Sequence, residues 1–217
     1  YQKSLDLNPS YYSAHNALGT ALHKKKDYAG AVISFQKAMS LRPKYVTAMN
    51  NLSVSYFEQG RADLALATAL QSRDVKPAQS QAYENRVLFH VRMGRPEQAI
   101  AAAQEAFSHG LSSAYLHAYL GLAHAAGKQT EAALAQFKAA LALRPNDARL
   151  HDFLGVAYVS AGQAGAAASE FEEALRLDPR FDQPHRNLAL TYLRLGRSTS
   201  AETEIDRYLA LAEEGVD

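Results

Sequence analysis

Cysteine and tryptophan are both absent from this sequence of 217 residues. Without cysteine the chain forms no disulfide, holds no metal through a thiolate and has no cysteine nucleophile. Nor is there a run of the roughly 18 apolar residues that a membrane-spanning helix needs, so we expect no direct insertion into a membrane. These absences remove disulfide-stabilised, thiol-dependent and membrane-spanning proteins from consideration.

An excess of either sign of charge is also missing. Lysine and arginine number 23 against 22 acidic residues, which gives a net charge of +1. A balanced chain creates no strong field toward a phosphate backbone, so we expect no nucleic-acid partner. The basic run from Lys24 to Lys26 falls at the end of a predicted helix, where cations offset the helix dipole. The 47% hydrophobic and 21% charged residues are typical of a folded soluble protein.

Proline and alanine recur at a fixed spacing along the chain. Five of the seven prolines lie 34 residues or twice 34 residues apart, and Leu111 occupies the one slot of this series that lacks proline. The prolines of the series are Pro9, Pro43, Pro77, Pro145 and Pro179, and the alanines that recur in every copy are Ala31, Ala65, Ala99, Ala133, Ala167 and Ala201. The chain is therefore built from a 34-residue repeat, and the invariant small residue indicates a close approach of two helices.

Each repeat has the pattern of a helical hairpin. Small, apolar and histidine residues spaced three and four apart mark one face of two successive helices. In the first repeat these residues are His15, Leu18, Gly19 and Leu22, followed by Ala31, Phe35 and Ala38. Short segments such as EQGRA and SAGQA separate the two helices, and proline follows the second. One hairpin cannot bury its apolar faces alone, so we predict an all-α solenoid of stacked repeats that share a core.

These columns of small, aromatic and proline residues in a 34-residue helix-turn-helix repeat resemble the tetratricopeptide repeat (TPR) family. The resemblance covers essentially the whole chain and implies a right-handed superhelix in a single domain, residues 1–217. The second helix of a truncated repeat would occupy 1–9, and six full repeats would occupy 12–45, 46–79, 80–113, 114–147, 148–181 and 182–215. For function, the resemblance implies a non-catalytic scaffold that binds a protein partner.

No repeat carries the tryptophan that the TPR family has near the start of the first helix. The corresponding residues are His15, Met49, Tyr83, His117, His151 and His185. Neighbouring repeats lie roughly 10 Å apart, whereas zinc ligands lie about 2 Å from the metal, so these histidines are poorly spaced to share an ion. We expect packed, hydrogen-bonded core histidines and no metal site.

The third repeat departs from the others. Arg86 and Val87 stand where most repeats have leucine and a small residue. Ala69 and Ala103 replace the bulky residue of the second helix in the second and third repeats. We hypothesise that Val87 and Phe89 fill the volume that these alanines leave.

The first helix of each repeat has a second face, opposite its core face, which we expect to line a concave groove. At 100° per residue, Ser13, Ala17 and Thr20 lie on this face, as do their equivalents in the other repeats. Several equivalents are apolar or aromatic, which water disfavours unless something covers them. The predicted peptide-binding residues are Asn51, Asn85, Tyr115, Tyr119, Arg149, Phe153, Asn187 and Arg194. The aromatic members either face a partner or pack across the groove, and the sequence leaves both readings open.

Asn51, Asn85 and Asn187 hold the same place in their repeats. They resemble the asparagine ladder with which the superhelix of O-linked N-acetylglucosamine transferases grips peptide backbones, although Tyr119 and Phe153 interrupt the series. An asparagine amide both donates and accepts, which suits an extended peptide backbone. The lysines of the carboxylate clamp found in chaperone-binding TPR proteins are missing, so we expect no binding of acidic chaperone C-termini.

No serine–histidine–acid set and no paired acids recur at a consistent position, so we expect neither catalysis nor a cofactor. Two alternatives stay open: a substrate-recruiting or regulatory TPR arm of a larger enzyme, and a self-assembling structural TPR protein. The opening YQKSLDLNP matches the end of a second helix, and no clearly polar helix caps the other end. We therefore expect a segment of a longer protein, or a homo-oligomer that covers the ends. The alanine-rich later repeats favour a bacterial source, cytoplasmic or periplasmic.

Overall fold

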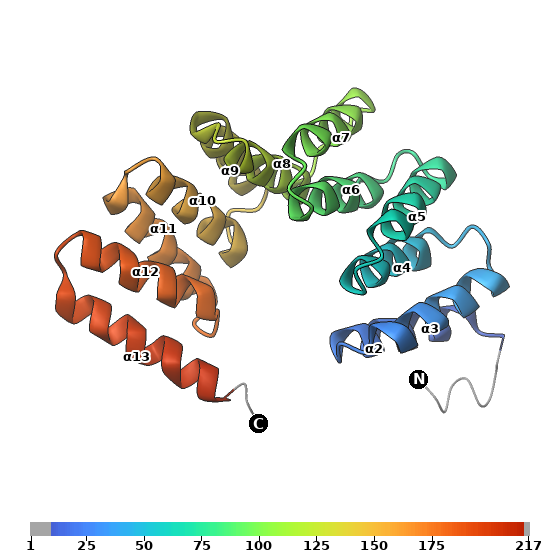
Figure 1. Cartoon of the computed structure of the whole chain (residues 1–217), viewed down its shortest axis with the longest axis horizontal. Helices are drawn as coiled ribbons and strands as arrows, with labels where there is room; N and C mark the ends of the chain where they lie inside the picture. The colour runs from blue at the N-terminus through green and yellow to red at the C-terminus, as the bar shows by residue number, and fades with distance from the viewer. Residues whose placement is uncertain (1–9, 215–217) are drawn as a thin grey trace. The chain divides into compact units, whose positions relative to one another are not determined.

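The computed structural model describes residues 10–214, and within this range it consists of twelve α-helices and no strand. The helices are α2 (Tyr12–Lys24), α3 (Tyr28–Leu41), α4 (Val46–Glu58), α5 (Ala62–Val75), α6 (Ser80–Arg92), α7 (Pro96–Ser108), α8 (Ala114–Ala126), α9 (Thr130–Leu143), α10 (Ala148–Ser160), α11 (Ala164–Leu177), α12 (Asp182–Arg194) and α13 (Ser198–Glu214). Each predicted full repeat therefore contains one pair of helices (Figure 1). The truncated repeat expected at 1–9, and residue 215 of the last repeat, lie outside the described residues.

Two compact units make up the chain. Unit 1 ends at Ser112 and contains α2 to α7, and unit 2 begins at Ser113 and contains α8 to α13. The boundary falls within two residues of a predicted repeat boundary. A single continuous domain over residues 1–217 stays a prediction.

Within each unit, the hairpins stack in chain order. The second helix of one hairpin packs on the first helix of the next, and successive first helices also contact one another. In the described part of each unit, the second helices of successive hairpins make no such contact. The first helices therefore form the inner wall of each unit. That this wall lines a binding groove stays a prediction.

None of the described helices combines the length and the apolar character required to cross a membrane. Across residues 10–214, histidine and acidic side chains form no group of three that could hold a metal ion.

The two helices of a hairpin approach closely because small residues line their contact. The recurring alanines Ala31, Ala65, Ala99, Ala133, Ala167 and Ala201 are all buried. In three repeats a glycine of the first helix also packs on a phenylalanine ring of the second. These pairs are Gly19 with Phe35, Gly121 with Phe137, and Gly155 with Phe171. A Cβ at any of the three glycines would lie 2.5 to 2.7 Å from the ring, which is too close for nonbonded carbon atoms.

In the repeats that have another residue at this glycine position, another residue also stands in place of the phenylalanine. Ser53 and Val87 hold the glycine position in the second and third repeats, and Ala69 and Ala103 hold the phenylalanine position. All four are buried. A larger residue at the glycine position is thus matched by a smaller residue at the phenylalanine position. The volume between the two helices therefore stays filled.

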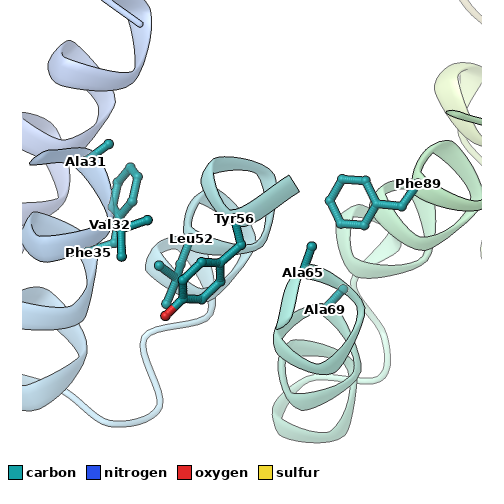
Figure 2. Packing of buried hydrophobic residues seen from close by; sticks show 8 residues of the cluster. All are labelled: Ala31, Val32, Phe35, Leu52, Tyr56, Ala65, Ala69 and Phe89. Carbon is teal, nitrogen blue, oxygen red and sulfur yellow. The ribbon is translucent and has the colours of Figure 1, made fainter. Parts of the chain in front are cut away.

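Phe89 explains part of the unusual third repeat. Figure 2 shows it beside Ala65 and Ala69 in the core of unit 1. Phe89 is 1% exposed and stacks on Phe57 with ring centroids 4.5 Å apart. It therefore fills space beside Ala69, as hypothesised, and Val87 is fully buried.

Three histidines at the tryptophan position, His117, His151 and His185, are buried or half-buried and have hydrogen-bond partners. His185 is 4% exposed, and its Nδ1 lies 2.6 Å from Glu204 Oε2. Its Nε2 lies 3.1 Å from the carbonyl oxygen of Pro179, which ends the preceding repeat. His151 makes the equivalent contacts with Glu170 and Pro145. Each of these rings therefore ties its own hairpin to the preceding one, which confirms the expectation of packed, hydrogen-bonded histidines.

An ion-pair network accounts for Arg86, the exception in the leucine column. Glu105 on α7 accepts from Arg86 of α6 at 2.7 Å and from Arg73 of α5 at 2.8 Å. Burial alone would raise the pKa of Glu105, but hydrogen bonds and charges from the two guanidinium groups outweigh it and lower that pKa. The network links the second and third repeats through side chains that are only partly exposed.

The turns between paired helices require a residue with positive φ. Glycine supplies it at Gly60, Gly94, Gly162 and Gly196. Lysine occupies the position in the other two repeats, with φ of 62° at Lys26 and 58° at Lys128. Because a positive φ is unfavourable for residues that carry a Cβ, the backbone is locally strained at both lysines.

We expect Lys128→Gly to raise the free energy of unfolding by about 0.5 to 1 kcal/mol, because relief of the left-handed strain exceeds the added entropy of the unfolded chain. Urea denaturation followed by circular dichroism measures the change. Gln129→Gly is the matched control, since Gln129 has φ of −96° and gains nothing from glycine. A Lys128→Gly chain no more stable than the wild type would contradict this explanation.

Candidate functional site

A cavity of about 360 Å³ lies within unit 2, between α8, α9, α10 and α12. Most of its wall is apolar, formed by Leu122, Ala125, Ala133, Phe137, Phe153, Val156 and Ala157. The polar lining residues are Thr130, Asp152, Ser160, Gln183, Arg186 and Asn187. Because three of the four helices are first helices of their hairpins, the cavity belongs to the inner wall of the unit.

Helix α10 supplies much of the lining. Asp152, Phe153, Val156, Ala157 and Ser160 recur at the three-and-four spacing that places residues along one helical face. Leu150 and Leu154, on an adjacent face of α10, are buried in the core. The sequence periodicity thus determines which residues of α10 face the cavity.

A buried acid and an amide meet in the cavity wall. Asp152 is 3% exposed, and its Oδ1 accepts a hydrogen bond of 2.9 Å from Asn187 Nδ2. Burial raises the pKa of Asp152, which the hydrogen bond from Asn187 and the charge of Arg186 partly oppose. Among residues 10–214, Asp152 forms no ion pair. An uncompensated carboxylate in an apolar wall is costly for folding, and this is the least expected feature of the cavity.

The structure brings two predicted site residues together here. Phe153 and Asn187 both line the cavity. The Phe153 ring also lies 5.9 Å from that of Phe137, and Phe153 is half-buried. Phe153 therefore packs inside the unit, as one of the two readings expects, and it also lines the cavity. That it faces a partner stays a prediction.

Three further predicted residues form a second cluster in unit 2. The Tyr115 hydroxyl donates to Asp147 Oδ2 at 2.8 Å, and its ring centroid lies 5.9 Å from that of Tyr119. The Arg149 guanidinium carbon lies 5.7 Å from the Tyr115 ring centroid. Burial and the Asp147 hydrogen bond raise the pKa of Tyr115. Tyr115 on α8 thus contacts Asp147, the residue that precedes α10, and Arg149 is exposed beside it.

In unit 1 the predicted asparagines reach back to the preceding repeat. Asn51 donates from Nδ2 to Asn16 Oδ1 at 3.1 Å. Asn85 is 4% exposed and donates to Ser53 Oγ and to the Asn50 carbonyl oxygen, while its own Oδ1 accepts from Gln81. Asn187 in unit 2 makes the same kind of contact with Asp152. These three asparagines therefore link neighbouring repeats through hydrogen bonds, and Asn85 makes the most of these bonds.

Asn51 and Asn85 share a second cavity of about 240 Å³ in unit 1, whose lining is mainly amide side chains. Arg194, the last predicted residue, is exposed at the end of α12. Asp152 was missed by sequence reasoning. Its position immediately before Phe153, a predicted site residue, could have identified it, because adjacent residues of a helix can both border its inner face.

Three family models, each described as a tetratricopeptide repeat, match the chain at residues 12–45, 86–148 and 158–214. Together they span more than half of the sequence. No curated protein matches the chain in sequence.

Solved structures of several TPR proteins are similar to this chain. One is the APC/C hetero-tetramer Cut9–Hcn1, with a TM-score of 0.83 and 20% identity over 98% of this chain and 42% of that one. Another is TTC0263, a thermophilic TPR protein from Thermus thermophilus, with a TM-score of 0.74 and 23% identity over 84% of this chain and 99% of that one. A third is YrrB, a TPR protein with an unusual peptide-binding site, with a TM-score of 0.57 and 20% identity over 82% of this chain and 91% of that one.

The chain thus spans less than half of the Cut9–Hcn1 chain that it matches. At these identities the structures show a shared fold. The family models, the paired helices and the 34-residue periodicity agree with one another, and the chain belongs to the tetratricopeptide repeat family.

Proposed function

We propose that this chain is a non-catalytic scaffold that binds a peptide or helix of a protein partner on the inner wall of unit 2. The observation that carries the proposal is exposed apolar surface next to a cavity. Val156 lines the cavity and is 45% exposed, and Leu190, its equivalent in the next repeat, is 53% exposed. Water disfavours such a surface, and contiguous apolar surface on a soluble chain is typical of a binding site.

The fold supports this function. TPR arrays present extended inner surfaces to their partners, and YrrB, which has the same fold, has a peptide-binding site. In this chain, the wall of unit 2 combines apolar side chains with amides from Gln183 and Asn187, which can pair with a peptide backbone. Apolar contacts would supply affinity, and the amides would orient the peptide.

The predicted residues divide into two roles under this proposal. Phe153 and Asn187 line the binding site, with Tyr115, Tyr119 and Arg149 as its extension along the inner wall. Asn85 acts as a brace between repeats, because its amide is buried and hydrogen-bonded. The same surface would serve a substrate-recruiting arm of a larger enzyme.

Selection of random linear peptides displayed on phage against the immobilised chain tests the proposal. The affinity of the selected peptides is then measured for Val156→Ser/Leu190→Ser. Both residues are exposed, so the variant should keep its fold, which circular dichroism verifies. We expect binding at least about tenfold weaker, because each lost apolar contact removes buried area and 1.4 kcal/mol corresponds to a factor of ten.

Ile33→Ser/Leu64→Ser is the matched control. These residues are also exposed and apolar, but they lie on second helices in unit 1. The control should bind the selected peptides as the wild type does. Selection of no peptide, or equal losses in the two variants, would contradict the proposal.

A further inference from the structure

The fold buries the Asp152 carboxylate without an ion-pair partner among residues 10–214. Two other buried or partly buried acids have arginine partners, Glu105 in Arg73 and Arg86, and Glu204 in Arg207. Among residues 10–214, the hydrogen-bond partner of the Asp152 carboxylate is the neutral amide of Asn187. A charge held in this way destabilises the folded state, and a desolvated ionisable group in a cleft is a candidate for a functional site.

The cavity around Asp152 has the size and lining for one long side chain. Its volume of about 360 Å³ lies at the small end of ligand pockets, which usually measure about 300 to 1,000 Å³. Leu122 and Val156 offer apolar contacts for a methylene stem, and Phe137 and Phe153 bring aromatic rings to the same wall. Lysine and arginine have this combination of an apolar stem and a cationic end.

We propose that this cavity receives a lysine or arginine side chain of the bound partner, with its cation paired to the Asp152 carboxylate. The inference deepens the proposed function, on which it rests, by naming the chemistry of the partner. An arginine guanidinium would donate to the carboxylate in a charge-assisted hydrogen bond, the strongest kind available to this side chain. The same pairing would offset the cost of burying Asp152.

Two other charged side chains act on Asp152. Arg186 lines the cavity and lowers the pKa of Asp152, and Asp182, also on α12, raises it. Both are exposed, so water and salt screen their charges, whereas the carboxylate of Asp152 is in the wall. The three groups sum to a net negative charge, which favours a cationic occupant. The charge of Arg186 opposes that occupant, and its removal should strengthen binding.

The test uses small probes that carry one side chain each. N-acetyl-L-arginine amide, N-acetyl-L-norleucine amide and N-acetyl-L-glutamate amide are titrated into the full chain, and amide chemical shifts of residues around the cavity are followed by NMR. We expect the arginine probe to bind about tenfold more tightly than the norleucine probe, a preference that corresponds to 1.4 kcal/mol.

Asp152→Asn should abolish that preference while leaving norleucine binding unchanged, and Arg186→Gln should increase it. Asparagine keeps an oxygen that can accept from Asn187, so the Asp152→Asn chain should fold, which its thermal unfolding verifies. No binding of the arginine probe, equal binding of arginine and norleucine, a preference for the glutamate probe, or a preference that survives in Asp152→Asn would each overturn the inference.

The outcomes separate this inference from the proposed function. Peptides that bind the inner wall of unit 2 without a lysine or arginine in common would support the scaffold function and overturn the cationic occupant. Arginine binding that depends on Asp152, with no peptide selected, would support the cationic site and contradict the scaffold function.

Discussion

Gly155→Val is expected to lower the free energy of unfolding by about 3 kcal/mol, because a Cβ at residue 155 would lie 2.5 Å from the ring of Phe171. The ring is 1% exposed and the two helices are closely packed, so neither has space to move. Urea denaturation followed by circular dichroism measures the loss. Gly165→Val is the matched control, because a Cβ at Gly165 on α11 meets no atom within 4 Å. That substitution should change stability little.

A double substitution tests whether the glycine and phenylalanine positions compensate for each other in volume. Phe171→Ala alone should cost about 3 to 5 kcal/mol, since it leaves a cavity in the core. Gly155→Val with Phe171→Ala should recover about 2 kcal/mol of the summed losses, because valine would occupy space that the ring vacates. The third repeat already folds with Val87 and Ala103 at these two positions. Additive losses in the double variant would show that the two columns do not compensate for each other.

Glu105→Gln is expected to lower the free energy of unfolding at neutral pH by about 2 kcal/mol, a value between those of exposed and buried ion pairs. The substitution leaves Arg73 and Arg86, both partly buried, facing a neutral amide. Glu173→Gln is the control, because Glu173 pairs with Arg176 on the surface of α11 and should contribute little.

The pH dependence of the Glu105→Gln effect follows from the direction of the pKa shift. Burial acts to raise the pKa of Glu105, but Arg86 and Arg73 lower it below its ordinary value of 4.5. The ionised carboxylate therefore stabilises the fold above pH 4.5, and this contribution is lost as the pH falls through the lowered pKa. The stability difference between wild type and Glu105→Gln should narrow below pH 4.5. A difference independent of pH would contradict the ion-pair account.

The fold was predictable because its determinants repeat. The 34-residue spacing, the alanine column and the helical periodicity predict the paired helices that the structure contains. The histidines at the tryptophan position were also predicted to be packed and hydrogen-bonded, because they stand in place of an aromatic residue and are too widely spaced to share a metal ion. The division into two units was not predicted, because periodicity continues across Ser112 and Ser113 and gives no sign of it.

The candidate site was predicted only in outline. Helical periodicity identifies the inner face, so Phe153 and Asn187 were found, but it does not say which atoms of the preceding repeat a side chain will meet. The contacts of Asn85 with Asn50 and Ser53 depend on how two repeats stack, and so does the single amide partner of Asp152. For the same reason, Arg86 looked like an exception until the structure placed Glu105 beside it.

The most direct test of a binding wall in unit 2 is methyl NMR of the chain with a phage-selected peptide. We predict that the largest shift changes occur at Leu122, Val156 and Leu190, which lie along that wall. Ile33 and Leu64 in unit 1 should change little. Changes concentrated at Ile33 and Leu64, with the methyl groups of unit 2 unaffected, would show that the partner binds elsewhere than the inner wall of unit 2.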